Sequence, residues 1–249
     1  MKRWMIACAA LAAAGQVRAD EAPLTFVTTM DLQQKTSAPH ARWKFTVVDA
    51  RTRVEYEENH IAGAINCPAS QAAALLPKLV KDKSRQLIFY CNGPKCTKSQ
   101  KAARVALSIG YHDVLEYNEG LPAWGKANLP VAGNPMPAVE MASVSPEDLR
   151  ARMESGKGPA VVDVRDAVEF ASIRVAGTVN IPLDELEKRA HELPAGELVV
   201  MDHTGSQTLI AGRVLQKAGR GGASRLEGGL LAWQQKGLPV EEKALAERH

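Results

Sequence analysis

The chain has 249 residues, of which 45% are hydrophobic and 24% are charged, and its formal net charge is +3. This composition is that of a globular protein with room for one large domain or two small ones, and it excludes a wholly disordered chain. Apolar runs stay shorter than the roughly 18–20 residues of a membrane span, and four cysteines are too few for a disulfide-stabilised mini-protein.

Residues 1–19 have the layout of a secretory signal peptide. Lys2 and Arg3 precede the short apolar run Trp4–Ala14, and small residues stand at the two positions that a signal peptidase reads, the last being Ala19. We therefore expect cleavage after Ala19, a periplasmic protein and no membrane span in the mature chain; a retained anchor is the alternative. Removing this segment, which also carries Arg18, lowers the formal net charge from +3 to 0, and no basic patch predicts nucleic-acid binding.

The mature chain carries one sequence pattern twice. A repeat of about 110 residues has the length of a domain rather than of a solenoid unit. The matched segments keep their order, and their offset falls from 111 at Cys91 to 109 at Ser99, so the first copy has two more residues than the second in this loop. The matched pairs are Val47–Arg51 with Val161–Arg165, His60–Asn66 with Arg174–Asn180, Leu87–Cys91 with Leu198–Asp202, and Gly120–Trp124 with Gly229–Trp233.

This repeat predicts two domains and a linker. We expect the first domain over residues 22–131, the linker over residues 132–139 and the second domain over residues 140–243. The linker segment (AGNPMPAV) contains two prolines and a Gly-Asn pair, which favour an irregular connection.

Within each copy, short apolar runs alternate with helical stretches. Strands are expected at Phe45–Asp49, Leu87–Tyr90, Ala160–Val164 and Leu198–Met201, as buried members of parallel sheets. The alternation predicts an α/β fold in which each of the two tandem domains is a small parallel sheet flanked by helices.

Residues at the expected helix ends have the usual capping chemistry. Ser99 is expected to be the N-cap of a helix over Gln100–Ile109, and Gly110 stands where a glycine commonly follows the last turn. In the second copy Ser145 is an expected N-cap, followed by Pro146 and by acidic residues in the first turn.

The loop Cys91–Lys98 (CNGPKCTK) joins a predicted strand to a predicted helix. Such a loop lies beyond the carboxyl end of a parallel sheet, where ligands bind, and the helix N-terminus favours an anion there. Lys95 and Lys98 add positive charge, so we expect Cys91 to have a lowered pKa, to be nucleophilic and to face an anionic substrate. The alternative is a core cysteine that ends a strand.

Together these features resemble a tandem rhodanese, a member of a sulfurtransferase family, over the whole mature chain. The motifs that carry the resemblance are Asp49-x-Arg51, His60–Asn66, the cysteine loop, and Gly120–Trp124 ahead of a Leu-Pro-Val segment. The resemblance implies that Cys91 takes a sulfane sulfur from a donor such as thiosulfate, holds it as a persulfide and passes it to a thiophilic acceptor such as cyanide or a thiol. We expect no cofactor and no metal.

The resemblance also implies roles for residues near Cys91. Asp49 and Arg51 match a strand-end pair that braces the fold beside the site. Lys98 stands where an Arg is usual, and the longer loop is similar to a Cys-x-Gly-Pro-x-Cys variety, so the donor stays open. The loop residues implied to bind substrate are Asn92, Gly93, Lys95, Lys98 and Ser99.

Two interpretations of Cys96 stay open. It resolves a persulfide or sulfenate on Cys91 by forming a disulfide, or it is a spectator or a static disulfide partner. Cys67 has the apolar counterpart Ile181 in the second copy, which predicts a small buried residue. Because the mature chain has three cysteines, at least one is unpaired or pairs between chains in an oxidising compartment.

The second copy has lost the nucleophile, since Asp202 stands at the position of Cys91 and Gln207 at that of the Arg usual in the family. A carboxylate cannot carry a persulfide, and Asp202 beside His203 does not have the spacing of a metal site. We expect an inactive domain that packs against the first or binds a protein partner.

Two other functions stay open. One is a thiol–disulfide redox protein using Cys91 and Cys96, although their spacing is longer than that of thioredoxin-like motifs. The other is a non-enzymatic binding or sulfur-relay module. A phosphatase or arsenate reductase is disfavoured, because Cys91–Ser99 contains no Arg to clamp an oxyanion.

Overall fold

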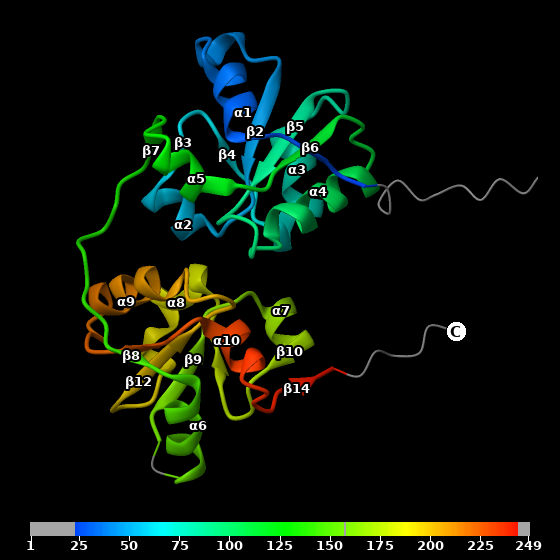
Figure 1. The fold of residues 1–249 in the computed structure, drawn as a ribbon. Coiled ribbons are helices and arrows are strands. Elements are labelled where there is room, and N and C mark those ends of the chain that lie inside the picture. The colour runs from blue at the N-terminus through cyan, green and yellow to red at the C-terminus, as the bar shows by residue number, and fades with distance from the viewer. Residues whose placement is uncertain (1–22, 157, 244–249) are drawn as a thin grey trace, which may run out of the picture.

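The computed structural model describes residues 23–156 and 158–243, so the predicted signal peptide lies outside the described residues. These residues form two units, one after the other along the chain. Figure 1 shows the units stacked, with the segment that connects them running along one side.

The first unit is built on a five-stranded parallel sheet in the order β1-β6-β5-β2-β4, with an antiparallel pair of β3 and β7 beside it. Its strands are β1 (Thr25–Phe26), β2 (Phe45–Asp49), β3 (His60–Ile61), β4 (Ile65–Asn66), β5 (Gln86–Tyr90), β6 (Val114–Tyr117) and β7 (Val131–Ala132). Its helices are α1 (Thr29–Thr36), α2 (Arg53–Glu58), α3 (Ala72–Leu79), α4 (Lys98–Ser108) and α5 (Gly120–Lys126), with 3-10 turns at His40–Arg42 and Ala69–Gln71.

The second unit repeats this topology. Its five parallel strands have the order β11-β9-β12-β13-β8, and β10 pairs with β14 in an antiparallel ribbon. The strands are β8 (Ser143–Val144), β9 (Ala160–Asp163), β10 (Ile173–Arg174), β11 (Val179–Asn180), β12 (Leu198–Met201), β13 (Ser224–Leu226) and β14 (Glu241–Glu242). The helices are α6 (Pro146–Glu154), α7 (Ala167–Ser172), α8 (Leu183–Arg189), α9 (Thr208–Lys217) and α10 (Gly229–Gln235), with a 3-10 turn at Ala190–Glu192.

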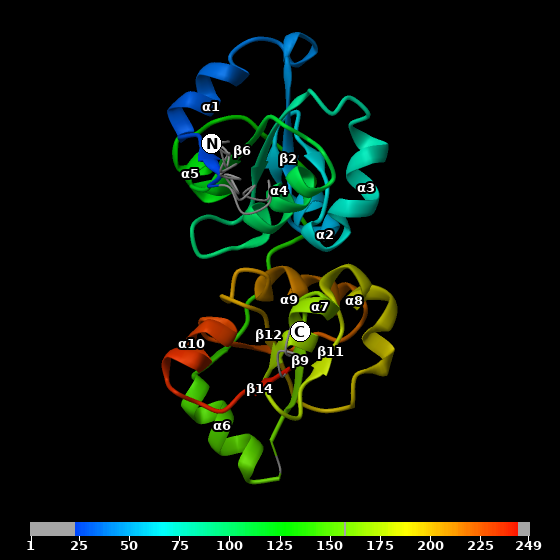
Figure 2. The same ribbon diagram turned by 90° about the vertical axis from the view of Figure 1, so that its right-hand side faces the viewer.

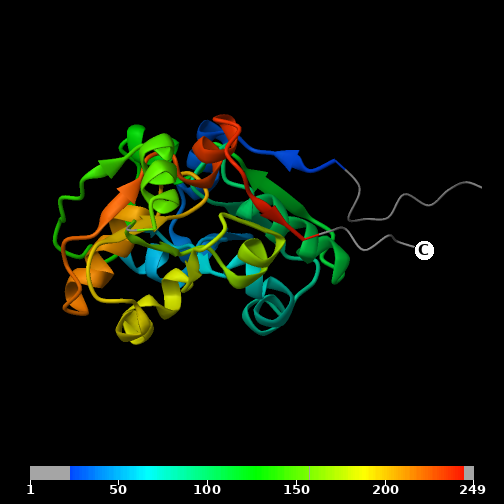
Figure 3. The same ribbon diagram turned by 90° about the horizontal axis from the view of Figure 1, so that it is seen from below.

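Helices cover both faces of each sheet because successive residues of a buried strand point to opposite sides. In the first unit Val48 and Phe89 pack with α3 and α4, whereas Val47 and Ile88 pack with α1 and α5. Figure 3 shows the same arrangement in the second unit, with α8 and α9 on one side of the sheet and α6 and α10 on the other. The predicted fold, two α/β units with parallel sheets, is confirmed.

The ends of α4 confirm one capping prediction and contradict another. Gly110 has φ +93°, and the N–H groups of Gly110 and Tyr111 donate to the last-turn carbonyls of Leu107 and Ala106, which closes the helix. Ser99, by contrast, is not the N-cap: α4 already begins at Lys98, and Ser99 lies inside its first turn. The Ser99 hydroxyl instead lies beside the Cys91 sulfur and donates to Glu116.

The start of α6 follows the prediction. The Ser145 hydroxyl accepts a hydrogen bond from the backbone N–H of Asp148, and Pro146 is the first helical residue.

Among the described residues, no helix combines the length and the apolar character that crossing a membrane requires.

The two units meet through polar contacts. Arg213 of α9 pairs with Glu58 of α2 at 2.8 Å, and Lys101 of α4 pairs with Glu169 of α7 at 2.7 Å. The carboxylate of Asp184 in α8 accepts the N–H groups at the start of α2. Figure 2 shows α7, α8 and α9 on the side of the second unit that faces the first.

The connection between the units is fixed to the first unit at its start. Ala132, which the sequence assigned to the linker, pairs with His60 as part of β7. Beyond it, the Asn134 N–H donates to the Glu57 carbonyl at 2.7 Å, and the Met136 N–H donates to the Glu58 carboxylate at 3.0 Å. The chain therefore leaves the first unit along the end of α2.

Candidate active site

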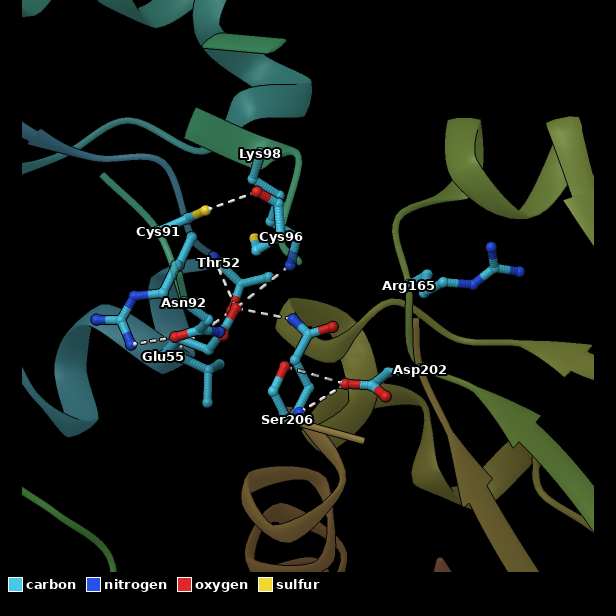
Figure 4. Close-up of polar contacts among 12 residues, drawn as sticks. Thr52, Glu55, Cys91, Asn92, Cys96, Lys98, Arg165, Asp202 and Ser206 are labelled. Atoms are coloured by element: carbon cyan, nitrogen blue, oxygen red, sulfur yellow. Dashed lines mark hydrogen bonds and ion pairs between the residues drawn. The ribbon is translucent and has the colours of Figure 1, made fainter. Parts of the chain in front are cut away.

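Cys91 follows the last residue of β5, at the carboxyl edge of the first sheet, and a short loop joins it to α4. Its side chain is buried, with 1% of its surface exposed. The sulfur lies 3.2 Å from the Cys96 carbonyl oxygen (Figure 4). It also lies 3.2 Å from the Ser99 hydroxyl. The loop thus folds back over the sulfur.

The surroundings of Cys91 favour its thiolate. The pKa of Cys91 falls to about 7, chiefly because the Cys96 side chain donates to it; burial opposes this, and Ser99 and the N–H of Gly93 contribute. The same contact raises the pKa of Cys96 well above its ordinary value. Burial raises the pKa of Cys67, which lies in the core as predicted, to about 11. Of the three thiols, Cys91 therefore ionises most readily.

Lysines are not the cause of this shift, contrary to the prediction from the sequence. Lys95 is exposed at the turn of the loop. Lys98 points to the other side, where its amino group lies 3.5 Å from Glu55. Burial lowers the pKa of Lys98, but the negative groups around it, Glu55 foremost, together raise the pKa above its ordinary value and keep the amino group protonated. The lowered pKa of Cys91 was correctly predicted, but its cause is hydrogen bonding.

Glu55 is the centre of a buried network that the sequence analysis missed. Its carboxylate closes a capping box with Thr52 at the start of α2 and accepts the side-chain amide of Asn92 at 2.7 Å. Burial alone would raise its pKa, but Lys98, Arg51 and these hydrogen bonds lower it to about 2. The motif Thr-x-x-Glu, a capping-box pattern, was the available sign of this residue.

The same carboxylate reaches the second unit. Gln207 Nε2, from the loop before α9, donates to Glu55 Oε2 at 2.7 Å (Figure 4). Asn92, one of the predicted substrate-binding residues, is thereby directed to Glu55 and Arg51 rather than to the sulfur of Cys91. The network joins α2, the Cys91 loop and the second unit.

Asp49 and Arg51 form the brace that the sequence predicted. The guanidinium of Arg51 donates to both carboxylate oxygens of Asp49, is buried, and also donates to the carbonyl of Asn59. Asp163 and Arg165 repeat the pair in the second unit, and Figure 4 shows Arg165 away from the Cys91 cluster. The pair therefore holds the strand end in both units, whether or not a cysteine is present.

A glycine lets the start of α5 lie against the Cys91 loop. Gly120 has φ +67°, and a Cβ there would collide with the carbonyl oxygen of Cys91 and the N–H of Gly93. The Leu121 N–H donates to the same Cys91 carbonyl at 3.0 Å. Gly229 lies against Asp202 in the same way in the second unit. This close approach explains why the motif begins with glycine in both copies.

In the second unit the cradle of the loop is filled by its own carboxylate. The Asp202 carboxylate accepts the backbone N–H of Gln207 at 2.6 Å and that of Gly205, and the Ser206 hydroxyl is 3.5 Å away (Figure 4). Burial raises the pKa of Asp202, although these N–H groups act against it. The donors that would face a bound anion are therefore already occupied.

A small cavity separates the two loops. It has a volume of about 20 Å³, close to that of a single water molecule. The Cys91 loop contributes Cys96 and Lys98 to its lining, and the second unit contributes Glu169, His203 and Gln207 among others. Cys96 therefore lies between this cavity and Cys91.

Within residues 23–156 and 158–243, no group of three metal-ligating side chains is assembled.

The sequence profile of one family, described as "Rhodanese-like domain", matches this chain twice, over residues 30–127 and 145–236. These matches cover more than half of the chain. The chain belongs to the rhodanese-like domain family. Both rhodanese-like domains carry the same five-stranded parallel sheet, so the tandem arrangement inferred from the repeat is confirmed.

Curated relatives resemble single domains of this tandem chain. "HTH-type transcriptional regulator Rv0324" of Mycobacterium tuberculosis is 38% identical over 34% of this chain and 37% of its own length. "Putative sulfur carrier protein YrkF" of Bacillus subtilis is 30% identical over 40% of this chain and 54% of its own length. A protein named "Sulfurtransferase" from Allochromatium vinosum is 26% identical over 39% of this chain and 92% of its own length. This chain thus spans about a third to a half of the first two relatives.

Among solved structures, thiosulfate sulfurtransferase from Pseudomonas aeruginosa aligns with 88% of this chain and 44% of its own, at 20% identity and a TM-score of 0.44. The BH2092 protein of Bacillus halodurans aligns with 44% of this chain and 77% of its own, at 30% identity and a TM-score of 0.40.

Proposed function

We propose that this chain is a periplasmic sulfurtransferase in which Cys91 carries a sulfane sulfur as a persulfide. The observation that carries the proposal is a buried thiol of lowered pKa at the carboxyl end of a parallel strand, facing the start of α4. Membership of the rhodanese-like family and the relative named "Sulfurtransferase" support it. The periplasmic location is proposed from the predicted signal peptide at residues 1–19.

The proposed reaction has two displacements. The Cys91 thiolate attacks the sulfane sulfur of a donor such as thiosulfate; the S–S bond of the donor breaks, and sulfite leaves with the bonding electron pair. The persulfide anion on Cys91 then gives its outer sulfur to cyanide or a thiol, which restores the thiolate. The N–H groups of Gly93 and Ser99 already act on the Cys91 sulfur, and they would stabilise the negative charge of both sulfur forms.

Intact-protein mass spectrometry tests this proposal. The mature protein, reduced and then exposed to thiosulfate, should gain about 32 Da on Cys91 and lose it on addition of cyanide. Cys91→Ser should show no gain, whereas Asp202→Ala, at the matching position of the second domain, should gain the same mass. A gain that persists in Cys91→Ser would refute Cys91 as the carrier.

A thiol–disulfide function is the second candidate, because the Cys96 side chain donates to Cys91 and both thiols are free in the structure. It predicts a loss of about 2 Da with Cys91 linked to Cys96 in place of the sulfur gain. A protein that shows neither change but binds a sulfur-carrying partner would instead be a relay module, as the name of the Bacillus relative suggests for that protein.

A further inference from the structure

A buried carboxyl group lies two hydrogen bonds from Cys91. The Ser99 hydroxyl is 3.2 Å from the Cys91 sulfur, and it donates to Glu116 Oε1 at 2.7 Å. Ser99 is fully buried and Glu116 is 2% exposed. The three side chains therefore form a continuous hydrogen-bonded path from the nucleophile into the core of the first domain, almost wholly shielded from solvent.

The position of Glu116 makes its charge costly. It occupies the middle of β6, in register with Phe89 of β5 and Phe26 of β1, on the face covered by α4. Burial raises its pKa; Ser99 and Arg104, both on α4, act in the opposite direction without cancelling the effect. A carboxylate here has reason to take up a proton, because its neutral form is easier to bury than its charged form.

The second domain provides an internal comparison. Arg225 pairs with Val200 in the register in which Glu116 pairs with Phe89, so the two residues occupy equivalent positions. The domain in which Asp202 replaces the cysteine therefore also has no carboxylate at this position. Its Thr208, the counterpart of Ser99, donates to the carbonyl of Gly205 instead. In this chain, the domain that has the thiol also has the buried carboxyl group, and the domain without the thiol has an arginine in its place.

We propose that Glu116 accepts the proton of Cys91 through Ser99. The Cys91 S–H bond breaks and its proton passes to Ser99 Oγ, while the hydroxyl proton of Ser99 passes to Glu116 Oε1. The electron pair of the S–H bond stays on sulfur. A neutral thiol and a carboxylate thus become a thiolate and a carboxylic acid, with one proton and one negative charge before and after, so no external base is needed.

In the reaction this transfer would precede attack on the donor, a role that rests on the proposed sulfur-transfer function. The proton stays on Glu116 while the sulfur is held as a persulfide anion, and it returns when the thiolate is restored. Glu116 touches neither donor nor acceptor; it sets the protonation state of Cys91 through Ser99.

The pH dependence of Cys91 alkylation tests the proposal without any sulfur donor. Iodoacetamide labelling of the Cys91 peptide is measured by mass spectrometry from about pH 5 to 9. In the wild type the rate should level off at acidic pH, because the pair shares its single proton. In Glu116→Gln it should fall about tenfold per pH unit below the pKa, since only the thiolate reacts. Glu116→Asp should restore part of the acidic plateau.

Ser99→Ala interrupts the same path and should lose the acidic plateau too, and the double variant should be no slower than the slower single one. The contrary hypothesis, that Glu116 acts only through its charge, predicts a different result. If Glu116 acts only as a nearby charge, Glu116→Gln lowers the pKa of Cys91 and labels faster than the wild type at about pH 5.5. That outcome would overturn the proposal.

An infrared measurement needs no change at residue 116. At neutral pH the wild type should show the C=O stretching band of a buried carboxylic acid, and Cys91→Ser should lack it, because no thiol proton is available to Glu116. A band absent from both proteins contradicts the transfer. If the labelling and the band behave as expected but thiosulfate adds no mass, the proposed function fails and the proton path stands.

Discussion

At the scale of single residues, the two thiols of the Cys91 loop have opposite roles because one donates to the other. The Cys96 side chain keeps its proton and stabilises a thiolate on Cys91, so the pKa of Cys91 falls and that of Cys96 rises. A second cysteine in the loop therefore contributes to reactivity without itself becoming a nucleophile. In this role Cys96 acts as a hydrogen-bond donor, which another donor side chain could replace. Disulfide formation, by contrast, needs the sulfur atom of Cys96 itself.

Replacing Cys96 distinguishes the two roles. Cys96→Ser keeps a donor, so the pKa of Cys91 should stay near 7 and persulfide formation in a single turnover should persist. Cys96→Ala removes the donor and should raise the pKa of Cys91 by roughly one unit, which lowers the alkylation rate at neutral pH about tenfold. The alkylation rate against pH measures both. Equal loss in the two variants would show that the sulfur atom of Cys96 itself is required.

At the scale of elements, Glu55 connects the start of α2 to the Cys91 loop. Its carboxylate is fully buried, and its pKa of about 2 lies below the ordinary 4.5. A depressed pKa of an acid means that ionised Glu55 stabilises the fold above pH 4.5, and that this contribution is lost as the pH falls from 4.5 toward 2.

Glu55→Gln should therefore lower the free energy of unfolding at neutral pH by about 3 kcal/mol, the equivalent of this pKa difference. It should also flatten the pH dependence of stability between pH 4.5 and 2, because the variant has no proton to bind there. Urea unfolding at neutral and acidic pH measures both effects. Glu57→Gln, on the exposed side of the same helix, is the control and should change little. Unchanged stability of Glu55→Gln would contradict the assigned network.

The loop before α9 shows how the second domain keeps its fold without a nucleophile. The Asp202 side chain accepts the N–H groups of Gly205 and Gln207, the donors that a bound anion would otherwise use. Asp202→Ala leaves these donors unsatisfied and should lower the stability of the second domain by about 1–3 kcal/mol. Persulfide formation on Cys91 should remain near the wild-type level. Loss of sulfur loading in a folded Asp202→Ala protein would show that the second domain takes part in transfer.

Elements that depend on local pattern could be predicted, and contacts that depend on tertiary register could not. The apolar runs Phe45–Asp49 and Leu198–Met201 match β2 and β12 because a buried strand in a parallel sheet is apolar along its length. Lys98 points toward Glu55, which lies on another element. The Ser99 hydroxyl, expected to cap α4, instead donates to Glu116 on β6. Neither partner is marked by sequence spacing.

At the scale of the molecule, the second domain covers the site of the first. Cys91 is buried, and the cavity between the two loops has room for about one water. A donor of several heavy atoms therefore needs the domains or the loop to move. The contacts between the domains include ion pairs and an amide hydrogen bond, polar contacts of a kind that permits relative motion.

Arg213→Ala should favour separation of the domains, because it leaves the buried carboxylate of Glu58 without its ion pair. Labelling of Cys91 by a bulky maleimide should then speed up by about tenfold, equivalent to roughly 1.4 kcal/mol, while a small reagent gains less. Arg189→Ala is the control, because it breaks exposed ion pairs within the second domain only. Added salt should speed labelling of the wild type and have less effect on Arg213→Ala, since screening weakens the same contact. If neither the substitution nor salt changes the rate with the bulky reagent, access to Cys91 is governed by movement of residues 92–97 within the first domain, and the second domain acts as a fixed wall of the site.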